Sequence, residues 1–214
     1  MLAKIDPART KVLRKGAFSG ESVLYWMSRD KRVDDNWALL AAQSVALNNK
    51  VPLIVCFQYL GHFPEANIRQ YGFQLKGLLE LKNKLESLNI EFILSQGRAS
   101  EVIPRIIDEK VVGTIITDYS PLRVYKKRVS KVLNRTKIPF YQIDAHNIVP
   151  VWKASPKKEY AAYTIRKKIH DNLDQFLTDY PSLIKHPYGN IRKDDILYDN
   201  IVKGLKIDFS VQEV

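Results

Sequence analysis

Short apolar runs alternate with longer segments of helical period between residues 23 and 145. The apolar runs are typical of strands that are buried on both faces of a parallel sheet, and they lie at 23–27, 53–57, 90–94, 114–118 and 140–144. The segments between them repeat apolar residues every three or four positions, which predicts helices at about 35–47, 66–88, 101–110 and 123–135. This alternation predicts an α/β fold, a doubly wound five-stranded parallel sheet with right-handed crossovers.

The alternation stops on both sides of this region. Residues 1–20 are basic and show little periodicity, so we expect a loosely ordered basic arm. After Asp144, an extended segment with two prolines leads to short helices expected at 158–173 and 174–185, and to a last helix capped by Asp194 or Asp195. We therefore divide the chain into an arm (1–20), an α/β domain (21–148), and a linker with a C-terminal helical extension (149–214).

The turn after the first predicted strand is the most highly charged turn in the α/β domain. It reads Ser28-Arg29-Asp30-Lys31-Arg32, and Asp34 or Asp35 can cap the helix that follows. In open parallel sheets, ligands bind outside the carboxyl ends of the strands, and this turn is expected there. The same residues fit two simpler interpretations, a solvated loop and a turn braced by an Arg29–Asp30 pair.

The charge of the chain indicates an anionic partner. Its 214 residues carry a net charge of +11, which suits nucleic acid or a membrane surface, although a basic surface can also serve solubility. Basic residues and tyrosines are interleaved over 151–193, a combination found on nucleic-acid surfaces. The DNA-binding candidates are Lys157, Lys158, Arg166 and Lys167, and a solvated helix face is the alternative for each.

Several classes of site are missing from the sequence. The single cysteine, Cys56, lies in an apolar run, so we expect a buried thiol, no disulfide framework within the chain and a reducing cytoplasmic location. The four histidines lack metal-ligand spacing, and no apolar run reaches the roughly 20 residues of a membrane span. Phosphate-loop, dinucleotide-binding and nucleophile-elbow motifs are also missing. We therefore assign no metal ligand and no catalytic residue.

Several stretches resemble a known family. The segment SRDKRVDDNWALL at 28–40 resembles the first motif of the photolyase/cryptochrome family. Further stretches are similar to one branch of that family, the class II cyclobutane pyrimidine dimer photolyases: PLIVCF at 52–57, EANIRQYGFQLKGL at 65–78, TDYSPLR at 117–123, DAHNIVPVW at 144–152 and EYAAYTIRKKI at 159–169. The resemblance covers about 23–185. It departs from the family pattern at Tyr163, where an Arg is usual, and at Lys167, where a Pro is usual.

The resemblance implies light-dependent repair of DNA that contains pyrimidine dimers. In such enzymes the damaged base is flipped into a pocket that holds reduced FAD, and this pocket lies in a large helical domain. The α/β half can hold an antenna chromophore, often 8-hydroxydeazaflavin in this branch. The chain stops near the start of the helical domain, so we expect an N-terminal portion that lacks the flavin domain and does not repair DNA alone. That domain is then a partner, in cis or as a separate chain.

The resemblance and the position of the turn together predict an antenna pocket. Its candidate residues are Met27, Ser28, Arg29, Asp30, Asn36 and Phe57. Arg29 and the first amides of the helix can stabilise an electron-rich ring, while Met27 and Phe57 supply apolar faces. Two other functions stay open: a stand-alone nucleotide-binding α/β module with a phosphate in this turn, and a non-catalytic DNA-binding protein.

Overall fold

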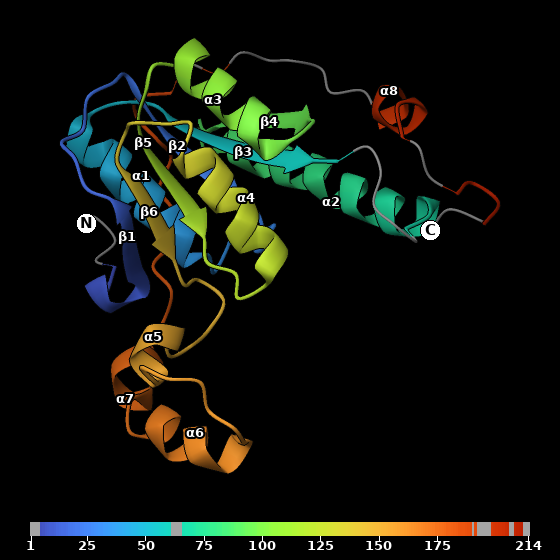
Figure 1. Cartoon of the computed structure of the whole chain (residues 1–214). Helices are drawn as coiled ribbons and strands as arrows, with labels where there is room; N and C mark the ends of the chain where they lie inside the picture. Colours follow the sequence, from blue (N-terminus) through green and yellow to red (C-terminus); the bar gives the residue numbers. More distant parts are fainter. Residues whose placement is uncertain (1–4, 61–65, 190, 192–197, 206–207, 212–214) are drawn as a thin grey trace.

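A twisted, mostly parallel sheet forms the centre of the molecule. The computed structural model describes residues 5–60, 66–189, 191, 198–205 and 208–211 (Figure 1). Within these residues, six strands form one sheet in the order β1-β6-β5-β2-β3-β4. The bounds of these strands are Thr10–Arg14 (β1), Ser22–Met27 (β2), Leu53–Tyr59 (β3), Glu91–Gln96 (β4), Val112–Asp118 (β5) and Phe140–Ile143 (β6).

Helices cover both faces of the sheet, as successive residues of the central strand show. Val23, Tyr25 and Met27 of β2 pack in a core with α1 (Trp37–Asn49) and α2 (Ile68–Ser87). Leu24 and Trp26 point the other way, into a core with α3 (Ala99–Glu109) and α4 (Arg123–Leu133). Because successive side chains of a strand point to opposite faces, this alternation is what a doubly wound sheet requires. The predicted α/β fold and its five parallel strands are confirmed.

The prediction of a loosely ordered basic arm at residues 1–20 is wrong in part, because a segment of it belongs to the sheet. Residues Pro7–Arg9 form a 3₁₀-helix (η1), and β1 pairs antiparallel with β6 as a sixth strand. Arg9 anchors this segment: its guanidinium donates to the carbonyl oxygens of Asn147 (2.8 Å) and Ile148 (2.6 Å) and lies 5.0 Å from the centre of the Trp37 ring. A buried cation with carbonyl acceptors and an aromatic face holds the arm in place.

The predicted N-cap of α1 is also wrong. Asn36, rather than Asp34 or Asp35, is the N-cap, and its side-chain oxygen accepts from the amides of Ala38 and Leu39 at 3.0 Å each. Asp35 has a positive φ of 51°, which turns the chain before the cap. A buried asparagine can both cap the helix and donate from its amide nitrogen, whereas an ionised aspartate can only accept.

The C-terminal region contains less helix than predicted. The helices after β6 are α5 (Val151–Ala154), α6 (Ala162–His170) and α7 (Leu173–Phe176), and residues 177–189 continue without a helix. That segment returns to the α/β domain, where the amide of Ile184 donates to the Gln43 side chain at 3.1 Å. The last helix, α8, spans Tyr198–Lys203, and its predicted caps Asp194 and Asp195 lie outside the described residues. None of the helices described is long and apolar enough to cross a membrane.

Candidate functional site

The strand order places a crevice at the carboxyl ends of β2 and β5. The chain runs outward from β2 through β3 to β4, then crosses to β5 on the other side of β2 and continues to β6. In open α/β sheets, the point where the order reverses is where ligands bind. The turn after β2 and the turn after β5 therefore flank the expected ligand position.

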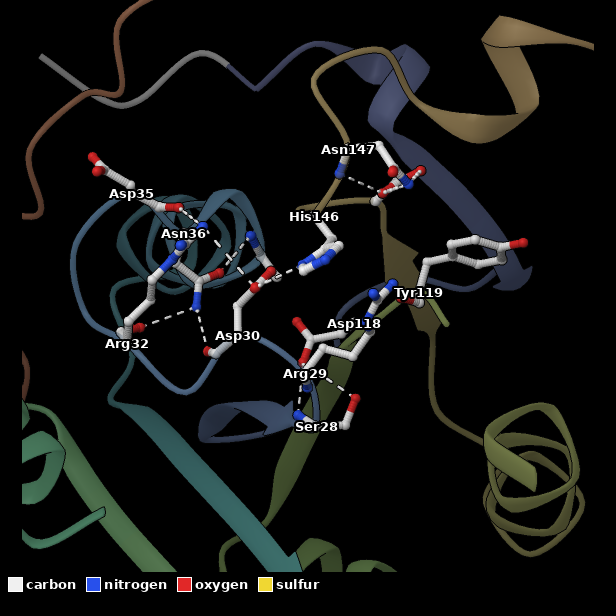
Figure 2. A network of polar contacts seen from close by, with 12 residues as sticks. Ser28, Arg29, Asp30, Arg32, Asp35, Asn36, Asp118, Tyr119, His146 and Asn147 are labelled. Atoms are coloured by element: carbon white, nitrogen blue, oxygen red, sulfur yellow. Dashed lines mark hydrogen bonds and ion pairs between the residues drawn. The ribbon is translucent and has the colours of Figure 1, made fainter. Parts of the chain in front are cut away.

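Asp118, the last residue of β5, joins these two turns (Figure 2). Its carboxylate accepts from the backbone amides of Ser28 (2.6 Å) and Arg29 (2.7 Å) and from the hydroxyl of Tyr25 (2.7 Å). Only 3% of Asp118 is exposed, so these bonds replace its hydration almost completely. A carboxylate with three such donors fixes the path of the turn.

The burial of this group shifts two pKa values. Burial raises the pKa of Asp118, and the donated bonds from Arg29, Tyr25 and Ser28 work in the opposite direction. Burial and the neighbouring Asp118 carboxylate raise the pKa of Tyr25 well above its usual value. Tyr25 therefore stays protonated and acts as a donor at neutral pH.

Asn36, Asp30 and His146 extend the same arrangement toward α1 and the segment after β6. The amide nitrogen of Asn36 donates to the backbone oxygen of Asp30 (3.1 Å) and to the Tyr25 hydroxyl (3.2 Å). The Asp30 carboxylate lies 3.1 Å from His146 Nδ1 and 4.0 Å from Arg32 Nη2, so its partners are these two residues rather than Arg29. We call these residues the Asp118 network: Tyr25, Ser28, Arg29, Asp30, Asn36, Asp118 and His146.

An apolar cavity lies on the other side of the turn. Its volume is about 520 Å³, and it is bounded by the ends of β2 and β3 and by residues of α2 and α4. We call it the strand-end cavity, and it is lined by Trp26, Met27, Ser28, Lys31, Phe57, Gln58, Tyr59, Leu60, Ala66, Gln70, Tyr71, Gln74, Leu122, Val124, Tyr125 and Arg128. Cavities of this size hold drug-sized organic ligands.

The structure separates the six predicted pocket residues into two groups. Met27, Ser28 and Phe57 line the strand-end cavity, and Ser28 also belongs to the Asp118 network through its backbone amide. The other three, Arg29, Asp30 and Asn36, do not line it and instead belong to the Asp118 network. Whether any of the six binds a ligand stays a prediction.

Lys31 belongs to the predicted charged turn and lines the cavity, although it is not among the six predicted pocket residues. Its ammonium lies 5.3 Å from the centre of the Phe57 ring, within cation–π distance. The residue as a whole is exposed, yet the protein around its ammonium removes water and lowers its pKa. Asp118 and Asp30 favour the charged form and partly offset this shift. Lys31 stands in a run of charged residues, so only the turn geometry distinguishes it.

The four DNA-binding candidates lie in the helical extension, away from the helices that enclose the cavity (Figure 1). Lys157 and Lys158 precede α6, whereas Arg166 and Lys167 lie on it. All four are exposed, and Lys167 pairs with Asp171 at 3.0 Å. Their role in DNA contact stays a prediction.

Comparisons with known proteins agree on one family. The family model for DNA photolyase matches residues 23–186. The chain is 46% identical to a deoxyribodipyrimidine photo-lyase of Potorous tridactylus over 91% of its length, and 41% identical to one of Arabidopsis thaliana over 84%. It spans only 37% and 38% of the lengths of these two relatives.

Solved structures show the same fold at low sequence identity. A cryptochrome from Synechocystis sp. PCC6803 aligns with a TM-score of 0.62 at 15% identity, over 79% of this chain and 37% of that one. A photolyase from Sulfolobus tokodaii, described with two FAD molecules and a novel light-harvesting cofactor, aligns with a TM-score of 0.60 at 18% identity, over 87% of this chain and 42% of that one. By its sequence and its fold, the chain belongs to the DNA photolyase family.

Proposed function

We propose that this chain is the N-terminal, antenna-type portion of a class II photolyase that splits cyclobutane pyrimidine dimers in DNA. The class II stretches of the sequence support the branch, and relatives named deoxyribodipyrimidine photo-lyase support the reaction. In this proposal residues 21–148 are the α/β domain and 149–214 begin the helical domain that binds FAD. The FAD-bearing remainder is supplied in cis or by a separate chain.

The strand-end cavity carries the proposal, because it offers a planar ligand apolar walls and a cation. Met27 and Phe57 supply apolar surface, and Ser28 and Gln58 supply polar groups. Lys31 can stabilise a ring that carries partial negative charge, as 8-hydroxydeazaflavin does. When bound, such a chromophore absorbs light and passes the excitation to the flavin. The side chains of this chain only bind the ring and orient it.

The test fills the cavity with a larger side chain. Ala66 lines the cavity, whereas Ala162 is exposed on α6 and serves as the matched control. We expect 8-hydroxydeazaflavin to bind the wild-type chain and Ala162→Trp equally, and to bind Ala66→Trp much more weakly, as followed by chromophore fluorescence. Unchanged binding by Ala66→Trp, with its melting temperature also unchanged, would place the ligand elsewhere.

A second arm tests the reaction. With FAD, a reductant and light, dimer-containing DNA should be repaired when the FAD-bearing part of a relative is added, and not by this chain alone. Repair by the chain alone would contradict the assignment of flavin binding to the remainder of the protein.

A further inference from the structure

The segment that follows β5 is strongly basic. No Asp or Glu occurs between Asp118 and Asp144, and the Lys and Arg residues of this stretch are Arg123, Lys126, Lys127, Arg128, Lys131, Arg135 and Lys137. All of them are exposed except Arg128, which is partly buried. Because α4 packs on the sheet through Val129 and Val132, its charges lie on the protein surface, on the side of the sheet that α3 and α4 cover.

Four of these cations form a row along α4. Arg123, Lys127, Lys131 and Arg135 are spaced four residues apart, and residues at this spacing are neighbours on one side of a helix. With a rise of about 1.5 Å per residue, the row extends over roughly 18 Å. Arg135 follows the end of the helix, and its guanidinium donates to the carbonyl oxygen of Ser100 in α3 at 2.9 Å. We call these four residues the α4 basic row.

Helix stability does not explain the α4 basic row. None of its members forms an ion pair within the described residues. Its neighbours place like charges one turn apart, which destabilises a helix. Arg123 also stands at the first position of α4, where the helix dipole disfavours a cation and the first turn has no acidic residue. An anionic partner would relieve each of these unfavourable interactions.

The start of α3 extends the positive surface beside α4. Arg98, the N-cap of α3, lines a hollow of about 320 Å³ together with Lys127, Arg128 and Lys131, and none of the described residues that line this hollow is acidic. The carboxylate of Glu101 lies 3.9 Å from Arg98 and offsets only that cation. Cations around a concave surface raise the local concentration of anions.

A long polyanion fits this surface better than a compact acidic group. Duplex DNA carries one negative charge per roughly 1.7 Å of its axis, so it offers a phosphate near every cation of the row without a matched spacing. An acidic protein segment would need carboxylates at matching positions. Lys and Arg contacts to phosphate position a duplex and do not read its sequence.

We propose that the α4 basic row, together with Arg98, binds the phosphate backbone of undamaged duplex DNA without regard to base sequence. The choice of DNA among polyanions rests on the proposed function, whereas the position and charge of the surface do not. This surface lies on the α/β domain and is separate from the four DNA-binding candidates, which lie on or near α6 in the helical extension (Figure 1). It needs neither a chromophore nor a flavin.

A short fluorescent duplex without dimers tests the inference. It is titrated with the whole chain at salt concentrations from about 50 to 200 mM, with fluorescence anisotropy as the readout. The variant Lys127→Gln/Lys131→Gln removes two charges from the row and keeps the helix propensity, which is similar for Lys and Gln. We expect it to bind about fivefold more weakly at the lowest salt. The slope of log affinity against log salt should become less steep by about 1.8, since each phosphate contact contributes about 0.9.

Lys50→Gln/Lys203→Gln is the matched control, because it removes the same charge from the opposite side of the sheet. Lys50 caps the end of α1 and Lys203 ends α8, which packs on the core of α1 and α2, and both lysines are exposed. This variant should keep the affinity within about twofold and the salt slope unchanged. The melting temperatures of both variants should equal that of the wild type.

A second pair of charges distinguishes the two basic surfaces. Lys157→Gln/Lys158→Gln removes charge from the helical extension. A greater loss of affinity with this variant than with Lys127→Gln/Lys131→Gln would move the DNA contact to the extension and overturn the inference. Binding that does not depend on salt, or tighter binding of an RNA duplex or of polyglutamate than of DNA, would also overturn it.

The same proteins separate this inference from the proposed function. Neither Lys127 nor Lys131 lines the strand-end cavity, so their variant should bind 8-hydroxydeazaflavin as the wild type does. Chromophore binding without any effect of the row on DNA affinity overturns only the present inference. Salt-dependent DNA binding through the row, with no chromophore binding by any of the proteins, contradicts only the antenna proposal.

Discussion

The residues of the turn after β2 form two sides, one in a buried polar network and one that lines a cavity. On one side, the Asp118 network buries charged and polar groups whose bonds go mainly to one another. On the other side, Met27 and Lys31 line the strand-end cavity, and Ser28 takes part in both sides. Residues adjacent in sequence therefore contribute separately to stability and to ligand binding. Substitutions on the two sides should differ in which of these they change.

The largest expected effect is on the network side. Asp118→Ala should lower the free energy of unfolding by about 3–5 kcal/mol, because two amides and the Tyr25 hydroxyl lose their buried acceptor together. Denaturant titration measures this loss of unfolding free energy. The exposed Asp108 of α3 gives the control Asp108→Ala, which should change this free energy by less than about 0.5 kcal/mol. Equal losses of unfolding free energy in the two variants would contradict a stabilising role for the Asp118 network.

A smaller effect distinguishes the two cations of the turn. Lys31→Gln should weaken binding of an anionic chromophore about tenfold and leave the unfolding free energy nearly unchanged, because Lys31 faces the cavity. Arg29→Gln should leave the affinity within about twofold, since a surface substitution away from the ligand has little effect. Arg29 enters the network mainly through its backbone amide, which the substitution retains. Titration of each folded variant compares them. A greater loss of affinity with Arg29→Gln than with Lys31→Gln would indicate that Arg29 contacts the ligand.

The smallest effect is a pH dependence that only the network side should show. Burial raises the folded-state pKa of Asp118 above its ordinary value of 3.8, which applies to the unfolded chain. Between these two values the folded chain binds more protons, so its stability rises as pH falls toward 3.8 and is lost as pH rises through the folded-state pKa.

Asp118→Asn keeps the shape of the side chain but cannot ionise, so it isolates this contribution. The unfolding free energy of the wild type minus that of the variant should increase as pH falls from 7 to 4. Denaturant titrations at several pH values measure this difference. The Asp30 carboxylate also raises the pKa of Asp118, but Asp30 is present in both proteins. A constant difference would mean that Asp118 has an ordinary pKa.

The sequence predicts the central fold because buried strands appear in it as local apolar patterns. Strands such as Leu53–Tyr59 are buried on both faces and therefore read as continuous apolar runs. β1 has no continuous apolar run, because Thr10–Arg14 is an edge strand that is partly exposed and rich in charge. Its position depends on β6 and on Arg9, which bonds to carbonyls more than 130 residues away. Short-range patterns do not contain this information.

The candidate site is predictable as a region but not residue by residue. The polar turn after an apolar strand correctly indicates the carboxyl end of β2 at the strand-order reversal. The turn itself has no period, so the sequence does not tell which side chains face the cavity. A positive φ at Asp35 and the buried cap at Asn36 set these directions, and both follow from tertiary contacts. For this reason the sequence does not distinguish Lys31, which lines the cavity, from Arg29, which does not.

The position of β1 at the sheet edge has a consequence for the order in which the chain assembles. Among the described strands β1 pairs only with β6, so its partner strand is synthesised about 130 residues later. The central strand β2 can pair with β3 as soon as Tyr59 has been made, because the two are joined by α1 alone. Closing a long loop costs more entropy than closing a short one, and domains fold as the chain emerges from the ribosome. β1 thus leaves the ribosome before the other five described strands, and we expect it to join the sheet after them.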